Sequence, residues 1–128
     1  MAFVVKVKDA KKLDLPGRLS REVVSAEKGA DSVTLRLVEI AVADLNESPR
    51  SPHRHLHFEE CIYVLAGQGT TRTDSGEHII EQGDTILIPP GEWHVTRNTG
   101  SETLKLLCFF PVSEIDSGTF LFQADDSE

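Results

Sequence analysis

The segment Pro52–Glu60 gathers more reactive side chains than any other stretch of the chain, with three imidazoles and two carboxylates in nine residues. In an extended strand, successive side chains point to opposite faces, so His53 and His55 share one face and can converge on a single ion. His57 has the same parity if the strand continues. Imidazole and carboxylate groups are ligands of divalent transition metals, so this spacing indicates a candidate metal site.

Two further polar groups can join these histidines from other strands. Glu60 opens an apolar run, and by strand alternation it faces the same way as Ile62 and Val64. His94 likewise shares a face with Thr96, in a later run. If the inner faces of these strands meet, His53, His55, Glu60 and His94 meet with them.

The elements that must position these groups are predicted to be β-strands, because runs rich in Val, Ile, Leu, Thr and Phe recur between turn residues. The predicted strands are Phe3–Lys8, Arg18–Ala26, Val33–Val42, His53–His57, Cys61–Gly67, Thr70–Thr73, His78–Glu81, Thr85–Ile88, His94–Asn98, Leu104–Phe110 and Thr119–Phe122. No helix of convincing length is predicted. This pattern is typical of an all-β sandwich or barrel.

Turn residues separate the strands at the expected places. The turns at 28–31, 74–77, 82–84 and 98–101 each contain Gly or Asn, which tolerate the positive φ of tight hairpin turns. Antiparallel pairing is therefore expected. Pro89-Pro90-Gly91 is predicted to form a rigid corner that delivers the chain into the His94 strand, because proline lacks the backbone donor that a central strand needs.

At these residues the sequence closely resembles the cupin superfamily. The first cupin motif, HxH, four residues, E, six residues, G, is matched by His53, His55, Glu60 and Gly67. The second motif, G, five residues, PxG, two residues, H, three residues, N, is matched by Gly83, Pro89, Gly91, His94 and Asn98. The chain departs from the pattern at Glu47, where the family has a glycine six residues before the first histidine.

This resemblance implies an all-β, double-stranded β-helix, or jelly-roll barrel, that holds one divalent transition metal (Fe, Mn, Ni or Zn) on His53, His55, Glu60 and His94. Residues 1–128 are expected to form a single cupin domain. Its motif core covers residues 33–110, an N-terminal strand arm residues 1–32 and a C-terminal tail residues 111–128. Five- or six-coordination leaves positions for substrate, so catalysis is possible.

Strand parity predicts a mostly apolar substrate pocket around the metal. Its lining is predicted to be Ile62, Val64, Thr96, Leu106, Cys108 and Phe110. His57 either lines this pocket or is exposed to solvent. Arg72 and Arg36 either hold a substrate carboxylate inside the barrel or form surface salt bridges. His78 is expected on an outer strand, away from the site.

Composition restricts the partners and the location. The formal net charge is −8 and the thirteen Lys and Arg are mostly scattered, so nucleic acid is not expected as a partner. No apolar run approaches the ~20 residues of a membrane span and no cleavable signal pattern opens the chain, so a cytoplasmic protein is expected. Cys61 and Cys108 lie in apolar runs and are expected to be free core thiols.

The leading functional hypothesis is a metal-dependent, dioxygenase-like enzyme whose small organic substrate chelates the metal through oxygen and is oxidised by O₂. One alternative is a non-redox lyase or isomerase of a small hydroxy acid, keto acid or sugar derivative. Another alternative is a non-catalytic module that binds a metabolite. A homodimer is expected, in which the alternating stretch Phe3–Lys8 adds as an edge strand to the neighbouring subunit.

Overall fold

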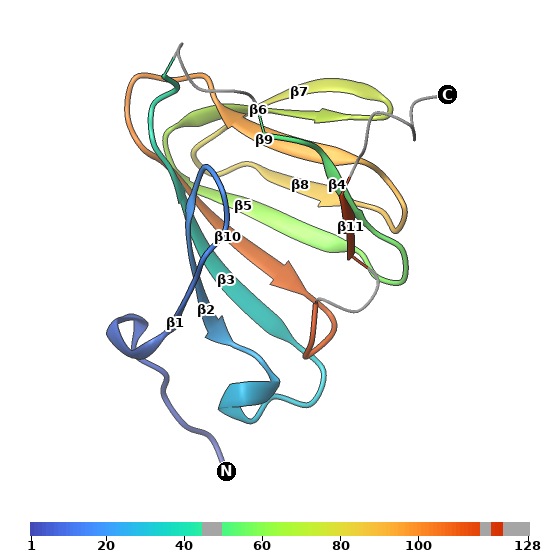
Figure 1. Ribbon diagram of the computed structural model, residues 1–128. Coiled ribbons are helices and arrows are strands. Elements are labelled where there is room, and N and C mark those ends of the chain that lie inside the picture. The colour runs from blue at the N-terminus through green and yellow to red at the C-terminus, as the bar shows by residue number, and fades with distance from the viewer. Residues whose placement is uncertain (45–49, 116–118, 122–128) are drawn as a thin grey trace.

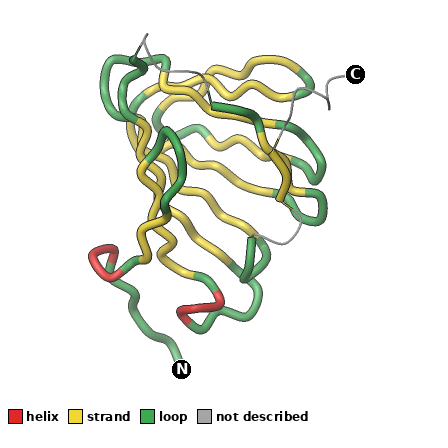
Figure 2. Tube along the Cα trace, in the orientation of Figure 1, coloured by secondary structure: helices red, strands yellow, loops and turns green. Residues whose placement is uncertain are grey.

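The computed structural model describes residues 1–44, 50–115 and 119–121, and these residues form an all-β sandwich of two antiparallel sheets (Figures 1 and 2). The strands are β1 (Lys11–Leu13), β2 (Leu19–Val24), β3 (Thr34–Ile40), β4 (His53–His55), β5 (Glu60–Ala66), β6 (Gln68–Thr73), β7 (Gly76–Glu81), β8 (Thr85–Ile88), β9 (His94–Asn98), β10 (Leu104–Phe110) and β11 (Thr119–Leu121). Two single-turn 3-10 helices, η1 (Val7–Asp9) and η2 (Ala26–Lys28), complete the described elements. The predicted all-β class is confirmed.

The two sheets have different strand orders. One is six-stranded, in the order β1-β2-β3-β10-β5-β8, and the other is five-stranded, in the order β11-β4-β9-β6-β7. All paired neighbours are antiparallel, and sequence-distant strands lie side by side, as where β10 pairs with both β3 and β5. This arrangement is the jelly-roll architecture expected of a cupin.

The apolar core lies between the sheets, because each strand turns alternate side chains inward. In β10, Leu106 and Cys108 are buried, whereas Lys105 and Phe109 face outward. The buried core cluster is made of Val38, Ile40, Phe58, Ile62, Val64, Ile80, Ile88, Leu104, Leu106, Cys108, Phe110 and Ile115. Among the described residues, no helix has the length and apolar character needed to cross a membrane.

Three predicted strands, at Thr85–Ile88, His94–Asn98 and Leu104–Phe110, are confirmed over their full lengths. The predicted strand Phe3–Lys8 is wrong for the single chain, because η1 occupies its end and no neighbouring strand pairs with the rest. Strand β1 was not predicted, since a three-residue strand carries no alternation pattern. It forms because the chain reverses at Gly17 (φ 72°) and pairs β1 with β2.

Two further boundaries differ from the prediction. The strand predicted over His53–His57 ends at His55, where the backbone bends before β5. The turn at 98–101 uses no positive φ; instead the Asn98 side chain holds it, donating to the carbonyls of Ile40 and Glu102 and accepting from the Gly100 N–H. Phe122 of the last predicted strand and Glu47, at the departure from the cupin motif, lie outside the described residues.

Candidate metal centre

Three strands carry the four predicted ligands, each at or near a strand end. His53 and His55 are the first and last residues of β4, His94 is the first residue of β9, and Glu60 is the first residue of β5. His53 lies opposite His94 in the β4–β9 pair. The three histidines therefore project from the five-stranded sheet, whereas Glu60 projects from the six-stranded sheet.

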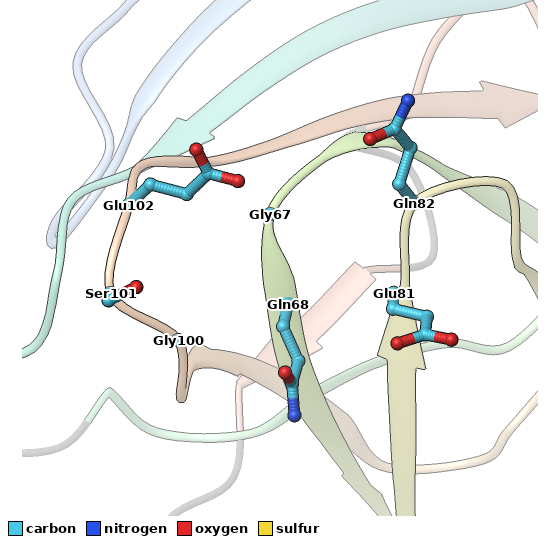
Figure 3. A pocket seen from close by; sticks show the side chains of 7 residues that line it. All are labelled: Gly67, Gln68, Glu81, Gln82, Gly100, Ser101 and Glu102. Atoms are coloured by element: carbon cyan, nitrogen blue, oxygen red, sulfur yellow. The ribbon is translucent and has the colours of Figure 1, made fainter.

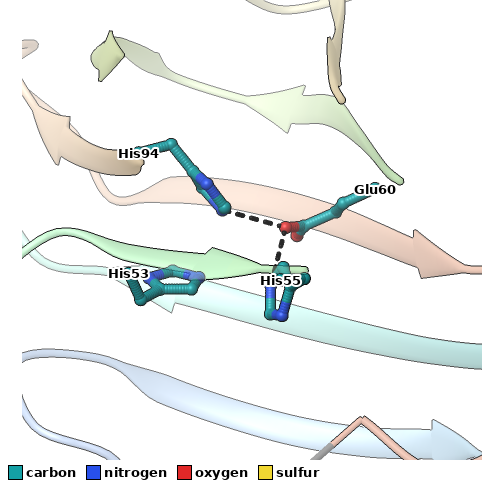
Figure 4. A group of neighbouring side chains, drawn as sticks. All are labelled: His53, His55, Glu60 and His94. Carbon is teal, nitrogen blue, oxygen red and sulfur yellow. Dashed lines mark hydrogen bonds and ion pairs between the residues drawn. The ribbon is translucent and has the colours of Figure 1, made fainter. Parts of the chain in front are cut away.

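The structure brings these four side chains together. One ligand atom from each residue lies within 4.8 Å of all the others. Glu60 Oε1 lies 3.1 Å from His94 Nε2 and 3.4 Å from His55 Nε2, and the His53 ring packs 4.2 Å from that of His94, centroid to centroid (Figure 4). His55, Glu60 and His94 are buried and His53 is partly exposed, so the cluster opens to solvent on its His53 side.

The cluster holds one carboxylate, that of Glu60, among three imidazole rings. Burial alone would raise the pKa of Glu60, but hydrogen bonds with His55 and His94 lower it to about 2. Burial, together with repulsion from His94, lowers the pKa of His53 to about 3. At neutral pH Glu60 is therefore a carboxylate and His53 a neutral imidazole, which are the forms that bind a metal.

His94 is oriented by both of its ring nitrogens. Nδ1 lies 3.0 Å from the backbone carbonyl of Glu92 and Nε2 points at Glu60. Burial opposes its charged form, but the hydrogen bond to Glu60 raises the pKa of His94 above its usual value. Because a carbonyl oxygen can only accept, Nδ1–H donates to Glu92, and this hydrogen bond keeps Nε2 directed toward Glu60 and the centre of the cluster.

The residues present therefore fit a divalent transition metal. Three imidazoles and a carboxylate form a donor set that suits Fe, Mn, Ni or Zn. One wall of the cluster is aromatic, since the His55 ring stacks on Phe58 (4.9 Å) and meets Phe110 edge-on (5.4 Å). This wall limits access of water from the core side.

Six of the other predicted pocket residues are buried. Ile62, Val64, Leu106, Cys108 and Phe110 are buried in the core between the sheets, and Thr96 is buried beside them, hydrogen-bonded to Thr71 (2.7 Å).

Of the two positions left open for His57 and for Arg72, the structure has the outer one in both cases, since both side chains are exposed and neither lines the barrel interior. His57 follows the bend after β4. Arg72 has the opposite parity to the buried Thr71 and lies on the outer surface. There it borders a pocket of about 190 Å³ beside Pro52, Thr73, Asp74 and Trp93. Arg36 is turned inward but is paired with Glu22 (3.0 Å).

A second pocket, of about 300 Å³, lies at the opposite ends of β5 and β9 from the ligands (Figure 3). It is lined by turn residues and by two strand ends: Gly67, Gln68, Glu81, Gln82, Gly100, Ser101 and Glu102. It contains no histidine or cysteine, so its chemistry is unlike that of the metal cluster.

Sequence reasoning missed Phe58, Glu92 and two half-buried arginines, Arg18 and Arg50, that lie near the cluster. Phe58 lies inside the metal-ligand segment, so its apolar character was a usable signal. The other three act through backbone contacts or long-range packing, for which the sequence holds no local signal.

Comparison with known proteins decides the family. The model of the family described as Cupin domain matches residues 38–110, which is more than half of the chain. The chain belongs to the cupin family. Uncharacterized protein MJ1618 of Methanocaldococcus jannaschii is 41% identical over 56 residues. That match covers 44% of this chain and 45% of the relative, so it spans less than half of the relative's length.

Solved structures resemble this cupin over most of its length. The polyketide cyclase RemF from Streptomyces resistomycificus is 29% identical, with a TM-score of 0.68 over 87% of this chain and 80% of that chain. Pac13 from Streptomyces, a nucleoside dehydratase, is 12% identical with a TM-score of 0.78 over 96% of this chain and 92% of that chain. The Pac13 likeness shows the shared fold.

Proposed function

We propose that this cupin is a metal-dependent enzyme that binds a small organic substrate through oxygen and rearranges it without net oxidation, as in cyclisation or dehydration. The buried cluster of three histidines and Glu60 carries the proposal, because such a donor set leaves coordination positions for substrate. The likeness to the polyketide cyclase RemF, at 29% identity, supports a non-redox reaction.

The residues have separate roles in this proposal. A divalent metal bound here would polarise a substrate oxygen and would lower the pKa of the groups that coordinate the metal. Glu60 supplies one negative charge, and the three histidines supply neutral nitrogen ligands. Phe58 and Phe110 exclude water from the core side of His55, whereas the partly exposed side of His53 is where substrate enters.

Oxidation of the chelated substrate by O₂ is the second candidate. The same donor set with open positions suits Fe(II), and an iron centre of this kind can activate O₂. The two candidates differ in the metal required and in the need for oxygen.

The experiment has two stages. Elemental analysis of protein purified without added metal identifies the bound ion. Protein loaded with that ion is then incubated with 1,3-diketones, hydroxy acids and catechols, in air and under anaerobic conditions. Product formation without oxygen supports the rearrangement, whereas turnover that requires and consumes O₂ supports oxidation. Tight binding of these compounds without turnover, in either atmosphere, contradicts both and favours a non-catalytic binding protein.

A further inference from the structure

Two arginines from separate loops meet beside the metal cluster. Arg18 ends the β1–β2 loop, which is blue in Figure 1, and Arg50 precedes β4. A Cβ built on Gly17 falls only 2.5 Å from Arg50 Cδ, so the Arg50 side chain lies directly against the residue before Arg18. Arg50 also donates to the backbone carbonyl of Thr96, two residues after the ligand His94. Arg50 thus connects the β1–β2 loop to the strand that carries the metal ligand.

The inner face of β2 continues this polar region. Ser20 and Glu22 share one face of β2, and Arg18 lies in the loop directly before that strand. Ser20 pairs with the core residue Val38, is only 1% exposed, and its hydroxyl has no hydrogen-bond partner among the described residues. A buried hydroxyl without a partner is unfavourable, because it loses its hydrogen bonds to water on folding and gains none in return. Ser20 thus offers a buried donor two residues from Arg18 along the chain.

Among the described residues, only one of the three arginines in this region has a carboxylate partner. Arg36 is neutralised by Glu22, which accepts from both Nε (3.1 Å) and a terminal nitrogen (3.0 Å). Within the described ranges, no carboxylate lies at ion-pair distance from Arg18 or Arg50, and their hydrogen bonds go to the backbone carbonyls of Pro16 and Thr96. Burial, followed by repulsion from Arg18, lowers the pKa of Arg50 to about 10, so the Arg50 guanidinium group remains charged at neutral pH.

We infer that Arg18, Arg50 and Ser20 form an oxyanion subsite beside the metal centre, and that the substrate carries a carboxylate or phosphate group in addition to its metal-binding oxygen. This inference rests on the proposed function where it calls the bound molecule a substrate, whereas the subsite itself depends only on this chain's residues. Two cations and a hydroxyl donor match an oxyanion, since guanidinium groups bind carboxylate and phosphate through paired N–H donors.

The test uses isothermal titration calorimetry on the full chain after EDTA treatment, with malonate and inorganic phosphate as probes at constant ionic strength. Binding of either probe is expected, and the stronger of the two identifies the preferred group. R18Q and R50Q should each weaken that binding by about tenfold, which corresponds to about 1.4 kcal/mol. Ser20→Ala should weaken it by a smaller factor. Binding of neither probe to the wild-type protein overturns the inference.

Control variants locate the anion and test folding. Arg97→Gln removes an exposed arginine that pairs with Glu77 (3.2 Å), so it should leave anion binding unchanged. His94→Ala should also retain it; loss of binding in His94→Ala but not in R18Q or R50Q would place the anion on the histidines and overturn the inference. R18K and R50K preserve the charge, so partial binding by these variants separates a local effect from unfolding.

Metal content separates this inference from the proposed function. R18Q and R50Q should retain metal at the wild-type level, because neither residue is a proposed ligand. Anion binding by a protein that retains no metal would leave the subsite standing while the proposed enzyme fails. Metal retention without any anion binding would overturn the subsite and leave the proposed enzyme standing.

Discussion

His94 joins the two sheets at the centre of the site through its two ring nitrogens. Nδ1 reaches the backbone of its own loop at Glu92 and Nε2 reaches Glu60 on the other sheet. His78 makes a useful contrast, because it is exposed and its ring is hydrogen-bonded to the Thr73 hydroxyl (3.2 Å). The two residues have the same side chain, so the place of a histidine in the fold determines whether it can hold an ion.

Replacing His94 with Ala should therefore lower metal affinity by at least about 100-fold, since even loss of a group that only orients a ligand lowers affinity by about 10–100-fold. His78→Ala should retain the wild-type metal content. Elemental analysis after dialysis against a weak chelator measures both. Equal metal content in the two variants would contradict the assignment.

The stability of the metal-free protein should fall as the pH drops below about 6.5. The ordinary pKa of His53 is 6.5 and folding lowers it to about 3, so the unfolded chain binds more protons between these values. Glu60 adds a further loss of folding stability as the pH falls from 4.5 to about 2, because its folded-state pKa is also lowered. His94 has the opposite sign: its raised pKa favours the folded state in acid, and that contribution is lost as the pH rises through its folded pKa.

Thermal unfolding in EDTA across this pH range tests the balance of these groups. His53→Phe should flatten the decline between pH 6.5 and 3, and His57→Ala, which changes an exposed ring, should not. An unchanged slope in His53→Phe would show that His53 does not titrate as expected.

At the scale of the elements, two glycines of the cupin motifs differ in an instructive way. Gly67, between β5 and β6, has φ +89°, and an added Cβ would lie 2.9 Å from the Thr103 carbonyl oxygen. Gly83, between β7 and β8, has φ +92° with open space around it. The first position needs glycine for both conformation and space, and the second for conformation alone.

Gly83→Ala should thus lower the free energy of unfolding by about 1–2 kcal/mol, the penalty of a left-handed conformation. Gly67→Ala should lower it by roughly 2–4 kcal/mol, because the backbone of the β9–β10 turn must also move. Urea denaturation measures both. Equal losses in the two variants would mean that the close approach at Gly67 is relieved at no energetic penalty.

How far the sequence predicts each element depends on how local its cause is. Strands β8, β9 and β10 were predicted in full because their apolar alternation lies between turn residues. The facing of His53, His55, Glu60 and His94 followed from parity, but the meeting of β4, β5 and β9 was expected from the cupin resemblance. Strand β1, the end of β4 at His55 and the convergence of Arg18 with Arg50 depend on contacts between distant segments, which a single sequence does not contain.

At the scale of the whole molecule, the N-terminal segment stands apart from the sheets (Figure 1). Phe3 is 65% exposed and Val4 is 85% exposed. We expect this segment to pair with a second subunit, as its alternating sequence suggests, which would cover these side chains.

Light scattering coupled to gel filtration should give twice the chain mass of 14.1 kDa. Deleting residues 2–8 should give the mass of one chain. A monomer mass at all concentrations in the full chain would refute the dimer, and a dimer that survives the deletion would place its interface elsewhere.

Strand β4 has only three residues and meets β9 at a single register position, yet it supplies two of the four ligands, and the fourth group comes from the opposite sheet. An ion held there would connect the two sheets through side chains, beside the short pairing of β4 with β9. A ligand bound only by the folded state raises the free energy of unfolding by about 2.7 kcal/mol when its concentration is 100 times its dissociation constant. The melting temperature should therefore rise with the concentration of free metal. Under chelation, backbone amides of β4 should exchange with deuterium sooner than those of β10.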